Sequence, residues 1–128
     1  MIIRFIIFGI AGWSIEVFWT GLASLSKRDF RATSTTSIWM FFIYGSVIFL
    51  EPVCDMLMPY PIIVRGSVYT ICIFAAEYVC GLILRKASIC PWDYSDSAYS
   101  IHGVIRLDFA PVWFVAGLVF ETVYRFLY

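Results

Sequence analysis

The chain has 128 residues, of which 62% are hydrophobic, 20% aromatic and only 14% charged, and its formal net charge is zero. A soluble domain is about half apolar and about a quarter charged, and a chain this small has too much surface to hide the apolar excess. The composition excludes an ordinary soluble domain and a basic nucleic-acid-binding domain, and it indicates a protein that lies in lipid.

Four segments are long and apolar enough to cross a bilayer, which takes about 20 residues in a helix. They are residues 5–25, 37–58, 62–84 and 107–127. The first is not a cleaved signal peptide, because its apolar run is too long and carries Glu16 in its middle. The sequence therefore predicts an all-α integral membrane bundle of four transmembrane helices, forming one transmembrane domain over residues 1–128.

The connections between these segments carry the basic residues that set orientation. Lys27, Arg28, Arg31, Arg85, Lys86 and Arg106 lie on one side, and Arg4, Arg65 and Arg125 on the other. Because cytoplasmic loops carry an excess of Lys and Arg, we expect loops 26–36 and 85–106 to be cytoplasmic. The membrane would be a bacterial inner membrane or a plasma membrane.

Each predicted span carries one glutamate, and these are Glu16, Glu51, Glu77 and Glu121. An ionised acid at mid-bilayer costs about 2.5–3.5 kcal/mol, so such residues face the bundle interior and find partners. Helical spacing places each acid on a face with small or hydroxylated residues, which let membrane helices approach closely. In the first helix this face also holds Gly9, Gly12 and Thr20.

Depth along the helices predicts which acids meet arginines. Glu51 and Glu121 lie toward the side of the termini, where Arg65 and Arg125 also lie, so we expect a polar network among these four. Glu77 lies toward the opposite side, near the polar loop and Arg106. Such a network either only fixes helix packing or lines a path for a solute or proton, and the sequence leaves both open. Pro52, directly after Glu51, is expected to kink the second helix.

The loop over residues 85–106 contains the most polar stretch of the chain, "CPWDYSDSAYSIHG" (90–103). Trp92 and Tyr94 are rings suited to the headgroup level. Asp93 and Ser95 can bond the local backbone, and Gly103 suits a tight bend. We predict an interfacial, partly re-entrant loop.

Enzymatic use of this loop is the alternative. Asp93 or Asp96 would then act as base and Ser95, Ser97 or Ser100 as nucleophile, with His102 lying between the aspartate and the serine. Neighbouring residues of one loop rarely form a triad, and no nucleophile motif is present. We therefore expect the chain not to be an enzyme. We also expect no cofactor and no metal, because neither the four cysteines nor His102 with the aspartates has ligand spacing.

Several motifs resemble one family of small membrane proteins. These are "TSIWMFFIYG" (36–45), "EYVCGLILR" (77–85), "CPWDYS" (90–95) and "WF" (113–114). The resemblance is to the putative ABC-transporter type IV, or CmpB-like, family, especially its transmembrane protein 229 branch. Matching positions include Gly12, Glu16, Tyr44, Arg65, Tyr69, Glu77, Gly81, Arg85, Trp92, Asp93, Tyr94, Ser95, Gly103, Trp113 and Glu121, whereas His102 and Arg106 lie outside the pattern. The resemblance implies a multi-pass membrane protein.

The function predicted from these features is that of a transporter-like or channel-like component for a polar solute, ion or lipid, with Glu16 and Glu77 on its path. The alternatives are a structural or assembly subunit and a lipid-modifying enzyme. The chain has no GxxxxGK[ST] phosphate loop and so no means of binding ATP by that route. The expected partners are membrane lipid and either further copies of the chain or other membrane subunits, with no nucleic acid.

Overall fold

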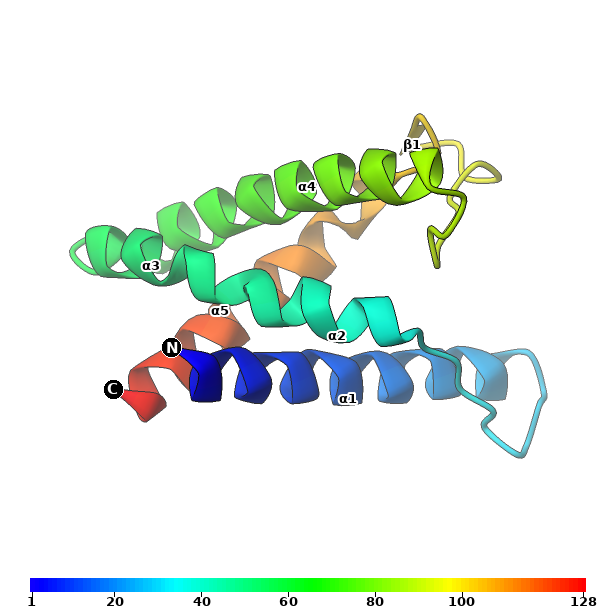
Figure 1. Cartoon of the computed structure of the whole chain (residues 1–128), viewed down its shortest axis with the longest axis horizontal. Helices are drawn as coiled ribbons and strands as arrows, with labels where there is room; N and C mark the ends of the chain where they lie inside the picture. The colour runs from blue at the N-terminus through cyan, green and yellow to red at the C-terminus, as the bar shows by residue number, and fades with distance from the viewer. The chain divides into compact units, whose positions relative to one another are not determined.

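A computed structural model describes all residues, 1–128 (Figure 1). The chain divides into two compact units, Met1–Ile48 and Phe49–Tyr128, and each is described on its own. Four helical segments are long and apolar enough to cross a membrane, and they are Ile2–Ser26, Ile38–Leu57, Ile62–Lys86 and Leu107–Leu127. The predicted all-α architecture with four candidate spans is confirmed, although the first helix begins three residues earlier than the sequence indicated.

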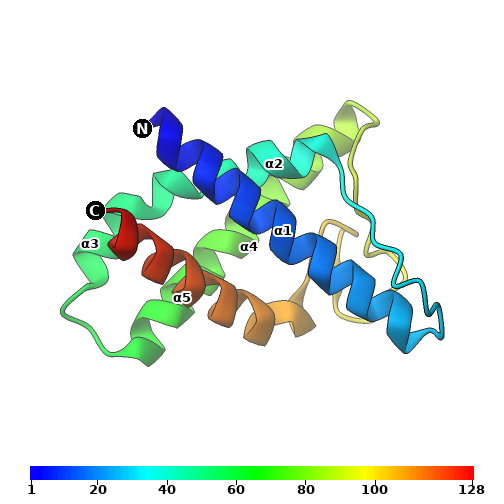
Figure 2. The same ribbon diagram turned by 90° about the horizontal axis from the view of Figure 1, so that it is seen from below.

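The first unit is a helical hairpin of α1 (Ile2–Ser26) and α2 (Ile38–Gly45), which run antiparallel (Figures 1 and 2). The two helices touch where α1 carries small residues. Gly12 is buried against the Tyr44 ring, and any Cβ at position 12 would overlap that ring. The Trp13 indole Nε1 donates a hydrogen bond to the Ser37 carbonyl at 3.1 Å. The face of α1 predicted from helical spacing is thus the face that packs.

The second candidate span is not one regular α-helix. Between α2 and α3 (Glu51–Leu57) lies the 3₁₀ helix η1 (Ser46–Leu50). Pro52 has no N–H and cannot donate to the carbonyl of Ile48, four residues earlier, so the α-helical ladder cannot continue unbroken through this point. The sequence predicts a kink at Pro52. In the structure the α-helix is interrupted there by the tighter 3₁₀ helix η1, and a new α-helix begins at Glu51.

In the second unit, α4 (Ile62–Lys86) packs against α5 (Ala110–Leu127), which follows the short 3₁₀ helix η2 (Leu107–Phe109). Small residues again make the close approach possible. Phe114 of α5 lies over Gly66 of α4, and a Cβ at Gly117 would lie 2.5 Å from the Cβ of Tyr69. These contacts bring the polar residues of α4 and α5 within bonding distance of one another.

Both long helices end in the same way. At the end of α1, Asp29 N–H bonds the Ser24 carbonyl and Arg28 N–H bonds the Leu25 carbonyl. This is a Schellman motif, in which the residue after the cap takes a left-handed conformation usually given to glycine. Here that residue is Arg28, with φ +64°, and at the end of α4 it is Ser88, with φ +59°.

The loop between α4 and α5 contains a feature absent from the sequence prediction. Strands β1 (Ser100–Ile101) and β2 (Ile105–Arg106) form a small antiparallel hairpin. His102 and Gly103 lie in its turn and both have positive φ. The hairpin adds a regular element to the predicted interfacial, partly re-entrant loop, whose position at a membrane interface stays a prediction.

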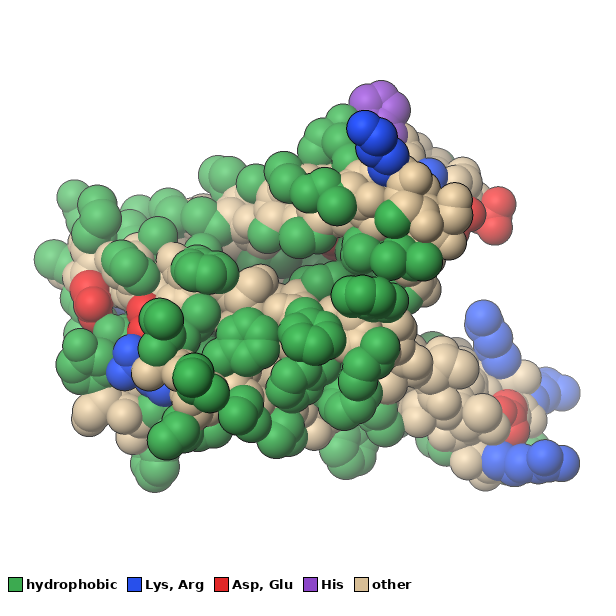
Figure 3. Space-filling model, viewed as in Figure 1, with side chains coloured by type: hydrophobic (Ala, Val, Ile, Leu, Met, Phe, Trp, Pro, Cys, Tyr) green, Lys and Arg blue, Asp and Glu red, His purple; other side chains and the backbone are tan.

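The outward surface over the helices is apolar. Figure 3 shows hydrophobic side chains covering most of the visible helical surface, with charged side chains gathered toward helix ends and loops. On α1, Ile2, Phe18 and Leu22 are each more than half exposed. A helix with this much exposed apolar surface requires an apolar solvent.

We expect Gly12→Ala to weaken the hairpin of α1 and α2, because its methyl group would force the Tyr44 ring out of place. Overpacking of this kind costs about 1–3 kcal/mol. Thermal unfolding in detergent measures the loss. Gly21→Ala in the same helix is the milder comparison and should cost less, since its Cβ would make a tight contact with the Ala32 carbonyl oxygen at 3.2 Å but would overlap no atom. Equal stability of the two variants would contradict the packing described.

Candidate intramembrane polar site

Glu121 is the most buried charged residue of the chain, with 3% of its surface exposed. Both oxygens of its carboxylate have partners. Oε2 accepts hydrogen bonds from the Tyr69 hydroxyl at 2.5 Å and from Arg65 Nε at 3.1 Å, and Oε1 pairs with Arg125 Nη2 at 2.7 Å. Two arginines therefore neutralise this acid inside an apolar unit, and a tyrosine adds a hydrogen bond, as buried charges require.

A second acid lies near the same end of α5. The Tyr124 hydroxyl donates to both carboxylate oxygens of Asp55, at 3.0 and 3.1 Å. Arg65 also donates from Nη1 to the Tyr60 carbonyl at 2.9 Å. These contacts fasten α3 and the turn after it to α4 and α5.

The network agrees in part with the sequence prediction. Arg65, Glu121 and Arg125 meet as expected, and Tyr69 joins them. Glu51, the fourth member predicted, is the first residue of α3, and its place in the network stays a prediction. The Asp55–Tyr124 contact was missed, because helical spacing groups residues on one face of a helix but does not say which neighbouring helix faces them.

Glu77 has a different environment from Glu121. Its Oε1 accepts a hydrogen bond from the Tyr94 hydroxyl at 3.2 Å, while Oε2 is buried without a hydrogen-bond partner. The Trp113 side chain is also within reach of this carboxyl, and its Nε1 is likewise buried without a completed bond. An incompletely bonded acceptor and an incompletely bonded donor thus lie beside one another between α4 and α5.

A row of three aromatic rings lies beside this second site, and its two outer members, Tyr94 and Trp113, are the ones near Glu77. The ring centroids of Tyr94 and Phe109 are 5.7 Å apart, and those of Phe109 and Trp113 are 6.4 Å apart, both edge to face. Arg106, which the sequence placed near Glu77, instead pairs with Asp108 at 2.8 Å and lies over the Phe109 ring. No positive side chain pairs with Glu77.

Glu16 belongs to the first unit and is half-buried on the packed face of α1. Its Oε2 accepts a hydrogen bond from the Thr36 hydroxyl at 3.4 Å, and the Tyr44 side chain is a second partner of the carboxyl. Its partners are hydroxyl groups and no arginine pairs with it. In this respect Glu16 resembles Glu77 more than Glu121.

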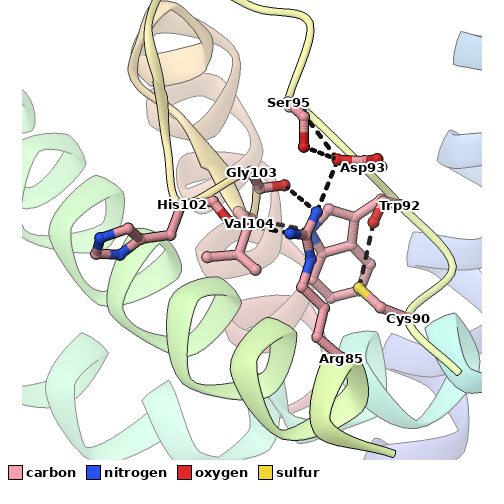
Figure 4. A network of polar contacts seen from close by, with 8 residues as sticks. All are labelled: Arg85, Cys90, Trp92, Asp93, Ser95, His102, Gly103 and Val104. Carbon is pink, nitrogen blue, oxygen red and sulfur yellow. Dashed lines mark hydrogen bonds and ion pairs between the residues drawn. The ribbon is translucent and has the colours of Figure 1, made fainter. Parts of the chain in front are cut away.

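The polar loop is tied to the end of α4 by one arginine (Figure 4). Arg85 donates to the carbonyls of His102 at 3.1 Å and Gly103 at 3.0 Å, and it pairs with Asp93 at 2.7 Å. Asp93 in turn accepts from the Ser95 hydroxyl and backbone N–H. We call these five residues the Arg85 clamp.

Two further features explain why the clamp needs its particular residues. A Cβ at position 103 would lie 2.6 Å from Ser95 Oγ and 2.7 Å from Arg85 Nη2, so only glycine fits there without displacement. The Trp92 indole donates to the Val104 carbonyl at 2.8 Å, and Gly81 of α4 leaves room for both residues. A pocket of about 350 Å³ borders the clamp, but Arg85, which lines it, is already fully engaged within the loop.

The residues of the enzymatic alternative are not brought together as a triad. The His102 ring bonds the Tyr78 hydroxyl at 2.8 Å, and Asp93 is held by Arg85 and Ser95. Neither an aspartate nor a serine contacts the His102 ring. The histidine lies in the hairpin turn, where its backbone carbonyl serves the Arg85 clamp.

Substitutions in the Glu121 network should reduce stability. Glu121→Ala would leave two arginines without their carboxylate, and loss of one partner of a buried pair costs about 3–5 kcal/mol. Tyr69→Phe, which removes one hydrogen bond to a charged group, should cost about 1.5–3 kcal/mol. Thermal or denaturant unfolding in detergent measures both. Thr122→Val is the control, because the Thr122 hydroxyl is exposed and bonds only the Leu118 carbonyl of its own helix.

The Arg85 clamp should weaken in acid. The hydrogen bonds from Ser95, followed by the nearby Arg85 guanidinium, hold the pKa of Asp93 below its ordinary value of 3.8. A carboxyl whose pKa is lowered by folding contributes stability above its ordinary pKa, and that contribution is lost as the pH falls through the lower, folded value. Trp92 fluorescence should therefore change below about pH 3.8. Asp93→Asn should abolish this step, and Asp96→Asn, in the same loop, should retain it.

Comparison with known proteins places these residues in a family. The sequence profile of the family described as "Putative ABC-transporter type IV" matches residues 3–128, nearly the whole chain. No solved structure matches the chain. The family match and the four candidate spans agree on a multi-pass membrane protein.

Proposed function

Because the chain belongs to the "Putative ABC-transporter type IV" family, we propose that it is a small transporter-like or channel-like membrane component in which Glu77 contacts the transported species. The carrying observation is the difference between the two acids of α4 and α5. Glu121 has a partner for each oxygen, whereas Glu77 keeps one buried oxygen without a bond. Intramembrane acids mark ion and proton pathways, and an acid with a free acceptor is the one able to take up a proton or a cation.

The chemistry of the Glu77 site favours a species that donates hydrogen bonds or carries positive charge. The free acceptor is a carboxylate oxygen, and no arginine or lysine neutralises it. The aromatic rings of Tyr94 and Trp113, which lie beside this carboxyl, also attract cations. A proton, a cation or a cationic headgroup fits this arrangement better than an anion does. Glu16, with hydroxyl partners only, is the second carboxylate proposed for the path.

Energy for transport would come from outside this chain. The sequence contains no phosphate loop, so an ATP-driven process needs a separate ATP-binding subunit. We propose that the chain acts as an oligomer or together with other membrane subunits.

A structural or assembly role is the second candidate, and the Glu121 network favours it. A saturated cluster of this kind fixes the register of α4 against α5 without leaving a group for a solute. The two candidates differ in what Glu77 does. If Glu77 is also only a packing residue, its substitution should affect stability and nothing else.

The test compares Glu77→Gln with Glu121→Gln in proteoliposomes that hold an entrapped pH-sensitive dye, with protons as the probe. We expect Glu77→Gln to keep its unfolding temperature and to reduce pH-dependent proton flux by about tenfold or more, since contacts to a charged group contribute about 1.5–3 kcal/mol. Glu121→Gln should instead lower stability and retain flux per folded molecule. Undiminished flux in Glu77→Gln would remove the proposal, and a fall in stability without a change in flux would support the structural role.

A further inference from the structure

The tip of the loop after α1 carries three positive side chains with no ionic partner. Lys27, Arg28 and Arg31 are all exposed, and none of them forms a salt bridge. The one acid among them, Asp29, accepts hydrogen bonds from the backbone N–H groups of Arg31 at 3.1 Å and Thr33 at 3.3 Å. Its carboxylate therefore shapes the loop and leaves the cations free. We call residues 27–31 the cationic tip.

The segment after the cationic tip is fastened along α1. The Ser24 hydroxyl donates to the Thr33 carbonyl, and Thr20 exchanges hydrogen bonds with Thr35, accepting from its N–H at 3.1 Å. These bonds run back along the last turns of the first candidate span. They hold the tip at the end of that candidate span.

The choice of residue at position 28 is informative. Arg28 occupies the left-handed position of the Schellman motif, where glycine is less strained than any L residue with a side chain. Backbone geometry alone would therefore favour glycine at this point. An arginine here adds a positive charge that forms no salt bridge within the protein.

Phe30 lies between the cations and is 85% exposed. A large apolar ring flanked by basic residues is typical of segments that lie in the interface between headgroups and acyl chains. Nothing in the first unit covers the Phe30 ring, so it is free to enter an apolar phase beside the basic residues.

We propose that the cationic tip binds the phosphate groups of anionic phospholipids through Lys27, Arg28 and Arg31, with the Phe30 ring placed among the lipid chains. The argument rests on charge complementarity, since the surface of the cytoplasmic leaflet is negative and basic residues beside a membrane span are drawn to it. It takes loop 26–36 to be cytoplasmic, the orientation that the same basic residues predict. It does not depend on the role of Glu77.

The test measures lipid preference of the purified, detergent-solubilised protein by native mass spectrometry. The probe is an equimolar mixture of phosphatidylglycerol and phosphatidylcholine. We expect the protein to prefer phosphatidylglycerol and this preference to fall with added salt. Arg28→Gly and Arg31→Gln should each reduce the preference about fivefold, since one basic residue near an anionic surface contributes about 1 kcal/mol. Arg28→Gly is the sharper variant, because it removes the charge while relieving the left-handed strain, so its unfolding temperature should not fall. Arg28→Lys should keep the preference.

Arg106→Gln is the matched loss of charge outside the tip, because the Arg106 guanidinium is already bonded to Asp108. It should change the preference less than twofold. An equal effect of Arg106→Gln and Arg31→Gln would overturn the proposal, since net charge alone would then explain the preference. Equal binding of both lipids by the unmodified protein would overturn it too. Competition by inorganic phosphate as strong as that of the lipid would show a free-anion site in its place.

Discussion

Lipid offers no hydrogen bonds, so each polar group within the candidate spans must be satisfied by the protein itself. This constraint explains the helices, whose backbone groups bond internally, and it also explains where the polar side chains lie. Thr70, Ser67 and Thr122 each bond a carbonyl four residues earlier in their own helix. Carboxylates cannot be satisfied in this way, because they need donors. They therefore decide which residues of neighbouring helices must meet.

Glu121 and Glu77 show two outcomes of that requirement on the same pair of helices. Near the chain's C-terminal end, two guanidinium groups and a phenol supply donors to both oxygens of Glu121. Near the loop between α4 and α5, a phenol supplies one bond to Glu77, and the adjacent indole does not complete a second. Leaving a buried acceptor unsatisfied costs about 1–3 kcal/mol. A cost of this size at one acid, beside a partner for each oxygen at the other, is the difference on which the proposed role of Glu77 rests.

Much of this arrangement could be predicted from the sequence. The length of the apolar segments predicted the four spans, and the 3.6-residue helical period predicted which helix faces are buried, because both follow from local geometry. The pairing of Arg65 and Arg125 with Glu121 followed from their similar depth. The partners of Glu77 and Arg106 did not follow, since they depend on how the loop folds back. The β1–β2 hairpin and the carbonyl contacts of Arg85 were missed for the same reason. A sequence does not indicate which backbone carbonyls of a loop will accept hydrogen bonds.

The Arg85 clamp connects the loop to the Glu77 site. Tyr94 follows Asp93 directly, and its backbone N–H bonds the Gly103 carbonyl at 2.9 Å, the same carbonyl that accepts from Arg85. The clamp thereby fixes the backbone from which the Tyr94 hydroxyl reaches Glu77. The polar stretch between α4 and α5 is therefore more than a connection between helices. It supplies the one completed hydrogen bond of the acid that remains partly unsatisfied, so a change in the loop reaches the carboxylate through a single side chain.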